Sequence, residues 1–511
     1  MASSWASATT SAAPDAILKR SRLPTLLLCA AAAGCAAVGP DYRQPAPPAA
    51  SRYTEAPLGA HTESAPGTAG AAQRFAPGAE VPADWWMLFH SQPLDQLVRA
   101  ALAGSPTLDA ARAALAQARE NLKAEYAVLY PSVDASLGVT RQRTNGATFG
   151  QTVLLPNEFT LYNASVKVSY AVDVAGGARR ELEALLAQID YQKLELEAAY
   201  LSLSGNVVTT ALQEASLRAQ IAATRESAGA QQRLVDLVER QLAIGAASRA
   251  EVLAQRALLA QTQATLPPLE KALAQTRNAL AALLGRVPAE AGLPRLELAQ
   301  LQLPRELPVS VPSELTRQRP DVRAAEALLR VASARVGVAE AARYPQLDLS
   351  ATLGSSALRS GALFTGPAGI WSVGAGLLQP VFHAGQLEAQ RDAAVAAFEQ
   401  ARAQYRGTVL GAFRDVADVL EALESDARAL SAQAEAAASA AGSLELVRGQ
   451  YALGAASALQ LLVAERQDAQ ARIGLAQAQA ARFSDTAALY QALGGGWWNR
   501  PQGIEQGSTQ Q

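Results

Sequence analysis

GAASRAE, at residues 245–251, recurs 209 residues later as GAASALQ, at residues 454–460. A glycine in this place ends a helix, because it accepts the left-handed backbone of a helix C-terminus. The serine three residues later begins the next helix, since Glu251 and Gln460 stand where a capping box requires an acid or an amide. Each stretch therefore predicts the tip of a helical hairpin.

Long helices lead into both tips. No proline occurs from Gly177 to Ile244 or from Gly385 to Leu453, and apolar residues recur in these runs at helical spacing. A helix of about 68 residues spans about 100 Å. A globular core does not hold a helix of this length, so the pattern predicts a coiled coil or a tube of helices.

The tips belong to an internal repeat. Ser105-Pro106 aligns with Arg319-Pro320, and Tyr130-Pro131 aligns with Tyr344-Pro345, both at an offset of 214 residues. The tips follow at an offset of 209 residues, so a variable loop must separate Pro131 from the first tip. Each half reads as helix, strand, loop, strand, very long helix, tight turn and long helix.

Four segments alternate apolar and polar residues with the period of a strand. Three are clear, at 133–139, 164–172 and 347–353, and the fourth begins near Trp371 and is less regular. Segments of about ten alternating residues are typical of membrane barrels, although a half-buried soluble hairpin has the same pattern. If the strands lie in lipid, four are too few to close a barrel, so several chains must share one.

The N-terminus reads as a targeting segment. Basic residues at 19–22 precede an apolar run at 23–33, which has the length of a signal peptide and is too short to cross a bilayer. Small residues then lead directly into Cys35, which resembles a bacterial lipobox and predicts a lipid on that cysteine. Ala36 in the next position favours delivery to the outer membrane. The alternative is an ordinary signal peptide with a chance cysteine.

Composition excludes several classes of protein. The net charge of −2 argues against a nucleic-acid-binding surface. The cysteines, Cys29 and Cys35, both precede the body of the chain, and the three histidines lie far apart, so we expect no metal site. No phosphate-binding loop, zinc-protease motif or nucleophile elbow is present, so we expect neither an enzyme nor a cofactor.

Taken together, the motifs resemble the TolC-like outer-membrane factor family, also called outer membrane efflux proteins, in the lipoprotein branch that serves resistance-nodulation-division (RND) pumps. These motifs are spread over nearly the whole mature chain, and their order and spacing match the family. The motifs are Cys35 with Val38-Gly39-Pro40-Asp41-Tyr42, Trp85-Trp86 with Phe89, Ser105-Pro106, the two Tyr-Pro junctions, Gln379-Pro380-Val381-Phe382 with Gly385, and the two tips.

The resemblance implies a mainly α fold with a small β part. Three chains would share a 12-stranded β-barrel, with four strands from each chain, and the long helices would continue it as a periplasmic α-barrel. The implied function is the outer-membrane exit duct of a tripartite efflux pump, which passively conducts drugs or other small toxic compounds. Its partners would be outer-membrane lipid, two further copies in a homotrimer, a periplasmic adaptor protein and an inner-membrane RND-type pump.

The same reading divides the chain into six segments. They are a signal peptide at 1–34, a lipid-anchored extension at 35–104, the first repeat at 105–287, a linker at 288–318, the second repeat at 319–495 and a flexible tail at 496–511.

The resemblance also assigns roles at the tips. The adaptor contact would lie at Gly245, Ala246, Ala247, Ser248, Gly454, Ala455, Ala456 and Ser457. The gate candidates are Glu251, Tyr451, Leu459, Val463 and Arg466. A hydrogen bond from Tyr451 or Arg466 to an acid would hold the entrance shut, and ordinary packing is the alternative. The family often has an acid where this chain has Val463.

A structural coiled-coil lipoprotein that spans the periplasm without conducting anything is the alternative function. The paired amphipathic strands distinguish the two interpretations, because a scaffold has no need of them.

Overall fold

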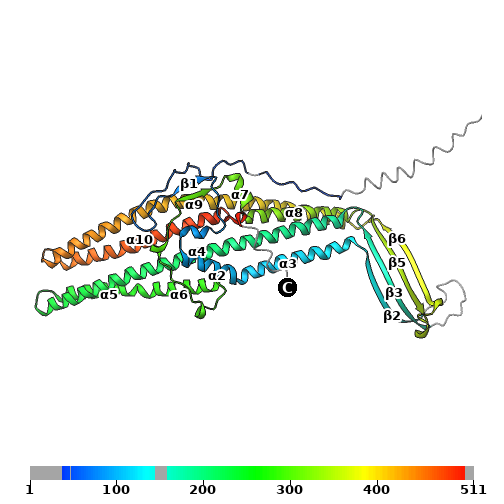
Figure 1. The fold of residues 1–511 in the computed structure, drawn as a ribbon, viewed down its shortest axis with the longest axis horizontal. Coiled ribbons are helices and arrows are strands. Elements are labelled where there is room, and N and C mark those ends of the chain that lie inside the picture. Colours follow the sequence, from blue (N-terminus) through cyan, green and yellow to red (C-terminus); the bar gives the residue numbers. More distant parts are fainter. Residues whose placement is uncertain (1–36, 47, 144–157, 501–511) are drawn as a thin grey trace, which may run out of the picture. The chain divides into compact units, whose positions relative to one another are not determined.

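The computed structural model describes residues 37–46, 48–143 and 158–500, and Figure 1 draws them as a ribbon. The chain forms two compact units. The first contains Arg119–Gln188, Leu329–Gln400 and the described residues up to Arg43. The second contains Ile189–Leu328 and the described residues of 44–118 and 401–500. Most of the chain is helical and the β part is small, which confirms the predicted fold class.

The first unit holds a four-stranded antiparallel sheet in the order β2-β3-β5-β6. The strands are β2 (Ser132–Arg143), β3 (Glu158–Val172), β5 (Gln346–Ala357) and β6 (Gly369–Leu378), and Figure 1 shows them side by side. The pairing of β3 with β5 joins the two sequence repeats in one sheet. All four predicted strands are present, including the one near Trp371, which the sequence marks only weakly.

Helices lead into and out of each strand pair. α3 (Pro106–Tyr126) precedes β2 and α8 (Pro320–Ala341) precedes β5, and each begins at a proline, whose missing N–H is no loss at the first helical position. α4 (Gly177–Ala243) follows β3, and α9 (Gln386–Ala452) follows β6, each with 67 residues. In the first unit α4 packs against α8 through small side chains, Ala184 and Ala187 against Val331 and Ala334.

The second unit contains two helical hairpins. α9 turns into α10 (Ala458–Ala492), which is continuous over 35 residues. α4 turns into α5 (Arg249–Ala264). The helix is interrupted at Thr265, and α6 (Leu266–Leu283) follows. The break differs from the long second helix that the sequence pattern predicts in both halves. Its cause is the pair Pro267-Pro268, which cannot donate the backbone hydrogen bonds of a helix interior.

Shorter elements build the rest of the second unit. β1 (Arg74–Pro77) pairs in parallel with β4 (Glu306–Val309). Trp85 is buried and stacks on Tyr490, with ring centroids 5.6 Å apart. The remaining elements are η1 (Trp85–Phe89), α2 (Gln92–Gly104), η2 (Ala127–Leu129), η4 (Pro288–Glu290), η5 (Leu298–Gln300), α7 (Pro312–Gln318), η6 (Ser360–Ala362), η7 (Gly366–Ala368) and η8 (Trp497–Asn499), of which η2, η6 and η7 belong to the first unit.

Residues 496–500, which the sequence analysis assigns to a flexible tail, are held in place. The Trp497 indole donates to the Gln318 carbonyl at 2.7 Å, and the Asn499 amide donates to the Val81 carbonyl at 2.9 Å. The predicted signal peptide, Cys35 and residues 501–511 lie outside the described residues, as does the whole loop between β2 and β3, residues 144–157. None of the helices in the described ranges combines the length and apolarity needed to cross a membrane.

Candidate functional site

The four strands present one continuous apolar face. In register, Val133 lies opposite Val168, which lies opposite Ala351, which in turn lies opposite Val373. Every second residue along each strand belongs to the same face. The face comprises Val133, Ala135, Leu137, Val139, Tyr162, Ala164, Val166, Val168, Tyr170, Val172, Leu347, Leu349, Ala351, Leu353, Trp371, Val373, Ala375 and Leu377.

Much of this face is exposed in the single chain. The exposed fractions of Leu137, Trp371 and Val373 are 76 %, 78 % and 77 %. Contiguous apolar surfaces of this kind are covered by lipid or by protein. The face therefore has the chemistry of a surface in contact with a membrane.

The opposite face of the sheet is polar. Asp134, Lys167 and Thr352 lie in one row across β2, β3 and β5. Further along, the Ser136 and Ser165 hydroxyls are 2.9 Å apart, and Ser356 donates to an Asn163 side-chain oxygen at 2.7 Å. A sheet with one apolar and one polar face matches a wall between lipid and water.

The sheet of one chain has two open edges. Within the described residues, β2 and β6 each pair along one side only, which leaves a row of backbone N–H and C=O groups of each strand without a strand partner. Each such group costs several kcal/mol in lipid, where water cannot pair with it. A sheet of this kind needs another chain at both edges before it is stable in a membrane.

Both tips have the predicted local geometry. Gly245 and Gly454 have φ of 77° and 76°. Ala246 donates its backbone N–H to the Gln241 carbonyl at 2.8 Å, and Ala455 donates to the Gln450 carbonyl at 2.8 Å. These are the 6→1 bonds of a Schellman motif, which satisfies the last carbonyls of α4 and α9.

The capping boxes are also confirmed. Glu251 donates its backbone N–H to the Ser248 hydroxyl and accepts the Ser248 backbone N–H at 2.8 Å through its carboxylate. Gln460 makes the same pair of contacts with Ser457. Among the eight predicted contact residues, Ala247 and Ala456 are half-buried, and the other six are exposed. The tips therefore offer rigid, small-residue surfaces to solvent.

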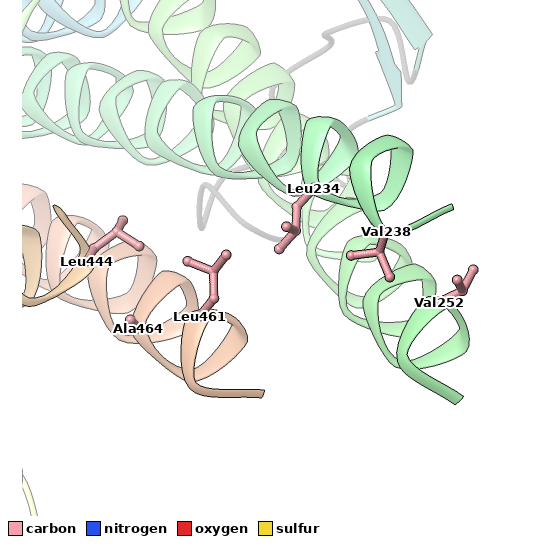
Figure 2. Packing of buried hydrophobic residues seen from close by; sticks show 6 residues of the cluster. All are labelled: Leu234, Val238, Val252, Leu444, Leu461 and Ala464. Carbon is pink, nitrogen blue, oxygen red and sulfur yellow. The ribbon is translucent and has the colours of Figure 1, made fainter. Parts of the chain in front are cut away.

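A small apolar cluster joins the two hairpins near their tips, as Figure 2 shows. Leu234 and Val238 of α4 and Val252 of α5 pack with residues of the second hairpin. These are Leu444, Leu461 and Ala464. Tyr451 packs at the edge of the cluster, where its hydroxyl donates to a Gln241 side-chain oxygen at 2.9 Å.

One predicted gate contact needs correction. The sequence interpretation offers Glu251 as an acid partner of Tyr451, but the observed acceptor is Gln241. The reason is local, because the Glu251 carboxylate is engaged by the Ser248 backbone. Burial is the main cause that raises the pKa of the Tyr451 hydroxyl above its usual value, and the nearby Glu251 charge acts in the same direction.

The other gate candidates share one face of α10. Leu459 and Val463 are 68 % and 45 % exposed, and Arg466 is exposed as well. Steps of four and three residues place all three side chains on the same side of the helix. Glu465 points elsewhere, because it is buried and forms an ion pair with Arg448 at 3.1 Å. The exposed face of α10 therefore carries an apolar pair followed by a cation.

Sequence reasoning missed three residues at the tips. Gln241 resembles many other polar residues of α4, and no local signal marks it as a partner. Ile244 and Leu453 directly precede the tip glycines. Their exposed fractions are 81 % and 86 %. Their matching positions in the two repeats, again 209 residues apart, were the available signal. Among the described residues no group of three or more histidine, cysteine or acidic side chains converges as a metal site would.

Comparison with known proteins gives consistent matches. A family model described as "Outer membrane efflux protein" matches residues 97–286 and 311–495. The pyoverdine export outer membrane protein OpmQ of Pseudomonas putida is 35 % identical over 421 residues, which cover 81 % of this chain and 88 % of OpmQ. The probable outer membrane lipoprotein SilC of Salmonella typhimurium is 28 % identical over 470 residues, which cover 91 % of this chain and 96 % of SilC.

Solved structures agree with these matches. The outer-membrane channel OprN superposes with a TM-score of 0.79 and 27 % identity, over 90 % of this chain and 99 % of the OprN chain.

Proposed function

The chain belongs to the outer membrane efflux protein family, and on this basis we propose that it is the outer-membrane exit duct of a tripartite efflux pump. It conducts substrates passively from the periplasm to the exterior. The observation that carries this proposal is the sheet of the first unit, with its exposed apolar face, its polar opposite face and its two open edges. A structural scaffold lipoprotein has no use for such a sheet.

The open edges support a shared wall. Three copies bring three times the four strands of one chain, which is twelve strands, and a closed sheet of twelve leaves no edge unpaired in lipid. The polar face then lines the duct, and the apolar face contacts lipid. We therefore propose a homotrimer in which β6 of one copy pairs with β2 of the next.

The tips support two further roles. Their exposed small residues, on rigid caps, offer a docking surface for the periplasmic adaptor, which connects the duct to the inner-membrane RND-type pump. The face of α10 with Leu459, Val463 and Arg466 is the proposed lining of the closed entrance. Tyr451 holds the two hairpins of one chain together through Gln241 instead of contacting an acid.

Cys35 is the proposed lipid-bearing mature N-terminus, which holds the chain to the outer membrane. The name of SilC, which describes a lipoprotein, supports this assignment by similarity. The exported compounds are proposed to be drugs or other small toxic molecules. The family consists of efflux channels, and we propose that this chain likewise performs no catalysis and needs no cofactor.

A pair of neighbouring residues on β2 tests the proposal. Leu137→Arg places a charge on the proposed lipid face, where it costs about 2–4 kcal/mol at mid-membrane, and Ser136→Arg places the same charge on the proposed lumen face at little cost. Membrane insertion and dye efflux are measured in cells that lack the native gene. We expect Leu137→Arg to lose both and Ser136→Arg to keep both. Equal behaviour of the two variants would contradict the assignment of the faces.

A further inference from the structure

Arg180, in the first turn of α4, donates hydrogen bonds to several acceptors in the N-terminal part of the chain. Its Nε donates to the Val38 carbonyl at 3.0 Å. One terminal nitrogen donates to the Ala37 and Gly39 carbonyls at 3.4 and 3.3 Å and to the Asp41 carboxylate at 2.9 Å. The Arg180 side chain is only 7 % exposed. In the N-terminal part of the chain, this buried guanidinium thus binds three successive main-chain carbonyls and one acid.

Two glycines allow the chain to approach so closely. A Cβ on Gly39 would lie 2.5 Å from the Cα of Gly337 in α8, and Gly39 also has a φ of +96°. A Cβ on Gly337 would lie 2.8 Å from the Arg180 side chain. Any larger residue at either position would push the N-terminal chain away from the helices.

Contacts on both sides of Gly39 hold the same segment. The Val38 backbone N–H donates to the Ala175 carbonyl at 3.0 Å, just after the end of β3. Tyr42 lies with its ring 5.6 Å from the Arg330 guanidinium, a cation–π contact with α8. Residues 37–42, which we call the docked segment, are therefore fixed at both ends.

One terminal nitrogen of Arg180 pairs with Glu183 on its own helix at 2.7 Å, but its Nε and its other terminal nitrogen bind the N-terminal part of the chain. The first turn of a helix is its positive end, where a cation is unfavourable, and burial adds a desolvation cost. Its neighbour Arg179 has a local role instead, because it binds Asp173 at 3.1 Å, next to the start of the same helix. The planar guanidinium of Arg180 is suited to hold several carbonyls at once.

We propose that Arg180, with Gly39 and Gly337, forms a docking site for the chain's own segment 37–42, and that this site fixes the attachment point of the lipid anchor. The docking rests on the contacts above. The anchoring consequence rests on the proposed lipid at Cys35. Two residues span at most about 7 Å, so a lipid on Cys35 begins close to Ala37 and thus near the end of β3. The docking site then holds the lipid anchor at the same level along the membrane normal as the end of the sheet.

Limited trypsin digestion of the full-length protein in detergent tests the docking. Arg43 is exposed and directly follows Tyr42, so cleavage after Arg43 requires the docked segment to detach. Cleavage after Arg52, which lies outside the docked segment, is the internal reference. Arg180→Ala is the test variant and Arg179→Ala its matched control. Gly39→Val tests the docking site with Arg180 intact.

We expect Arg180→Ala and Gly39→Val to accelerate cleavage at Arg43 relative to Arg52 by tenfold or more, which is the effect of losing about 1.4 kcal/mol of docking free energy. Arg179→Ala should leave this ratio unchanged. An unchanged ratio in Arg180→Ala would overturn the proposal, whether or not Gly39→Val releases the segment. The mass of the released peptide tests the lipid on Cys35 separately, so docking without lipid and lipid without docking are distinguishable.

Discussion

The Tyr451 hydroxyl donates to a Gln241 side-chain oxygen at 2.9 Å, and so joins the last turn of α9 to the last turn of α4. A small apolar cluster and a long hydrogen bond from the Gln255 side chain to the Ala458 carbonyl, at 3.5 Å, accompany this bond between the two hairpins. A short set of contacts is easily exchanged for another, since a single hydrogen bond contributes about 0.5–1.5 kcal/mol net. The tips of one chain are therefore held together by a small set of local contacts.

Loss of that link should loosen the closed entrance. Tyr451→Phe and Gln241→Leu each remove one partner, and we expect each to raise leak conductance in planar bilayers. The double variant should add little beyond either single one, because both remove the same bond. Fully additive increases would show that the Tyr451–Gln241 bond is not the source of the effect.

The tip glycines should resist substitution for backbone reasons alone. Nothing lies within 4 Å of a Cβ built on Gly245 or Gly454, so only the positive φ opposes a side chain. Gly→Val at either position should cost about 1–2 kcal/mol locally and impair efflux more than membrane insertion. Gly229→Ala, inside α4 and equally unobstructed, is the control and should be neutral or slightly stabilising. Normal export by both valine variants would refute the assigned role of the tips.

Val463 should control ion selectivity if it lines the entrance. Val463→Asp in three copies places carboxylates in a narrow pore, where their field is weakly screened, so we expect a shift of the reversal potential towards cation selectivity in a salt gradient. Glu465→Gln alters a charge two residues away that is buried against Arg448, and it should not shift the potential. An unchanged potential in Val463→Asp would place Val463 outside the pore.

What the sequence could predict depended on the range of the interaction. The tips at Gly245 and Ser248 follow from residues at most three or four apart, and their geometry was predicted correctly. The strands follow from alternation within each segment. The Tyr451–Gln241 bond joins residues 210 positions apart, and the packing of two hairpins decides it, so local reasoning assigned another partner.

Other features had signals of uneven strength. The break between α5 and α6 was not predicted, although the pair Pro267-Pro268 is a strong local signal against a continuous helix. Arg180 carried only a faint signal, a cation at the unfavourable end of a helix, and its acceptors lie about 140 residues earlier in the chain.

A carboxyl pair in the second unit should make stability depend on pH. Burial, together with a hydrogen bond to Asp426 and the charge of Asp426, raises the pKa of Asp485 to about 7. The neighbouring Arg482 interacts with the same Asp426 and is itself buried. A carboxyl pKa raised above its unfolded value near 3.9 means that the folded state binds the extra proton.

The stability gained from that proton is present at low pH and lost as pH rises towards about 7. Thermal unfolding of the detergent-solubilised protein should therefore show a Tm that falls between pH 5 and pH 8. Asp485→Asn, which cannot ionise, should flatten this part of the profile. An equally steep fall in the variant would assign the pH dependence to other groups.

The number of chains that complete the sheet tests the central claim most directly. Native mass spectrometry of the detergent-extracted protein, after removal of bound detergent, gives this number, and planar-bilayer recordings of the same sample give its conductance. We expect one species with three times the mass of the mature chain, and this species should conduct ions. A stable monomer that conducts ions as well would contradict the shared sheet, and with it the proposed exit duct.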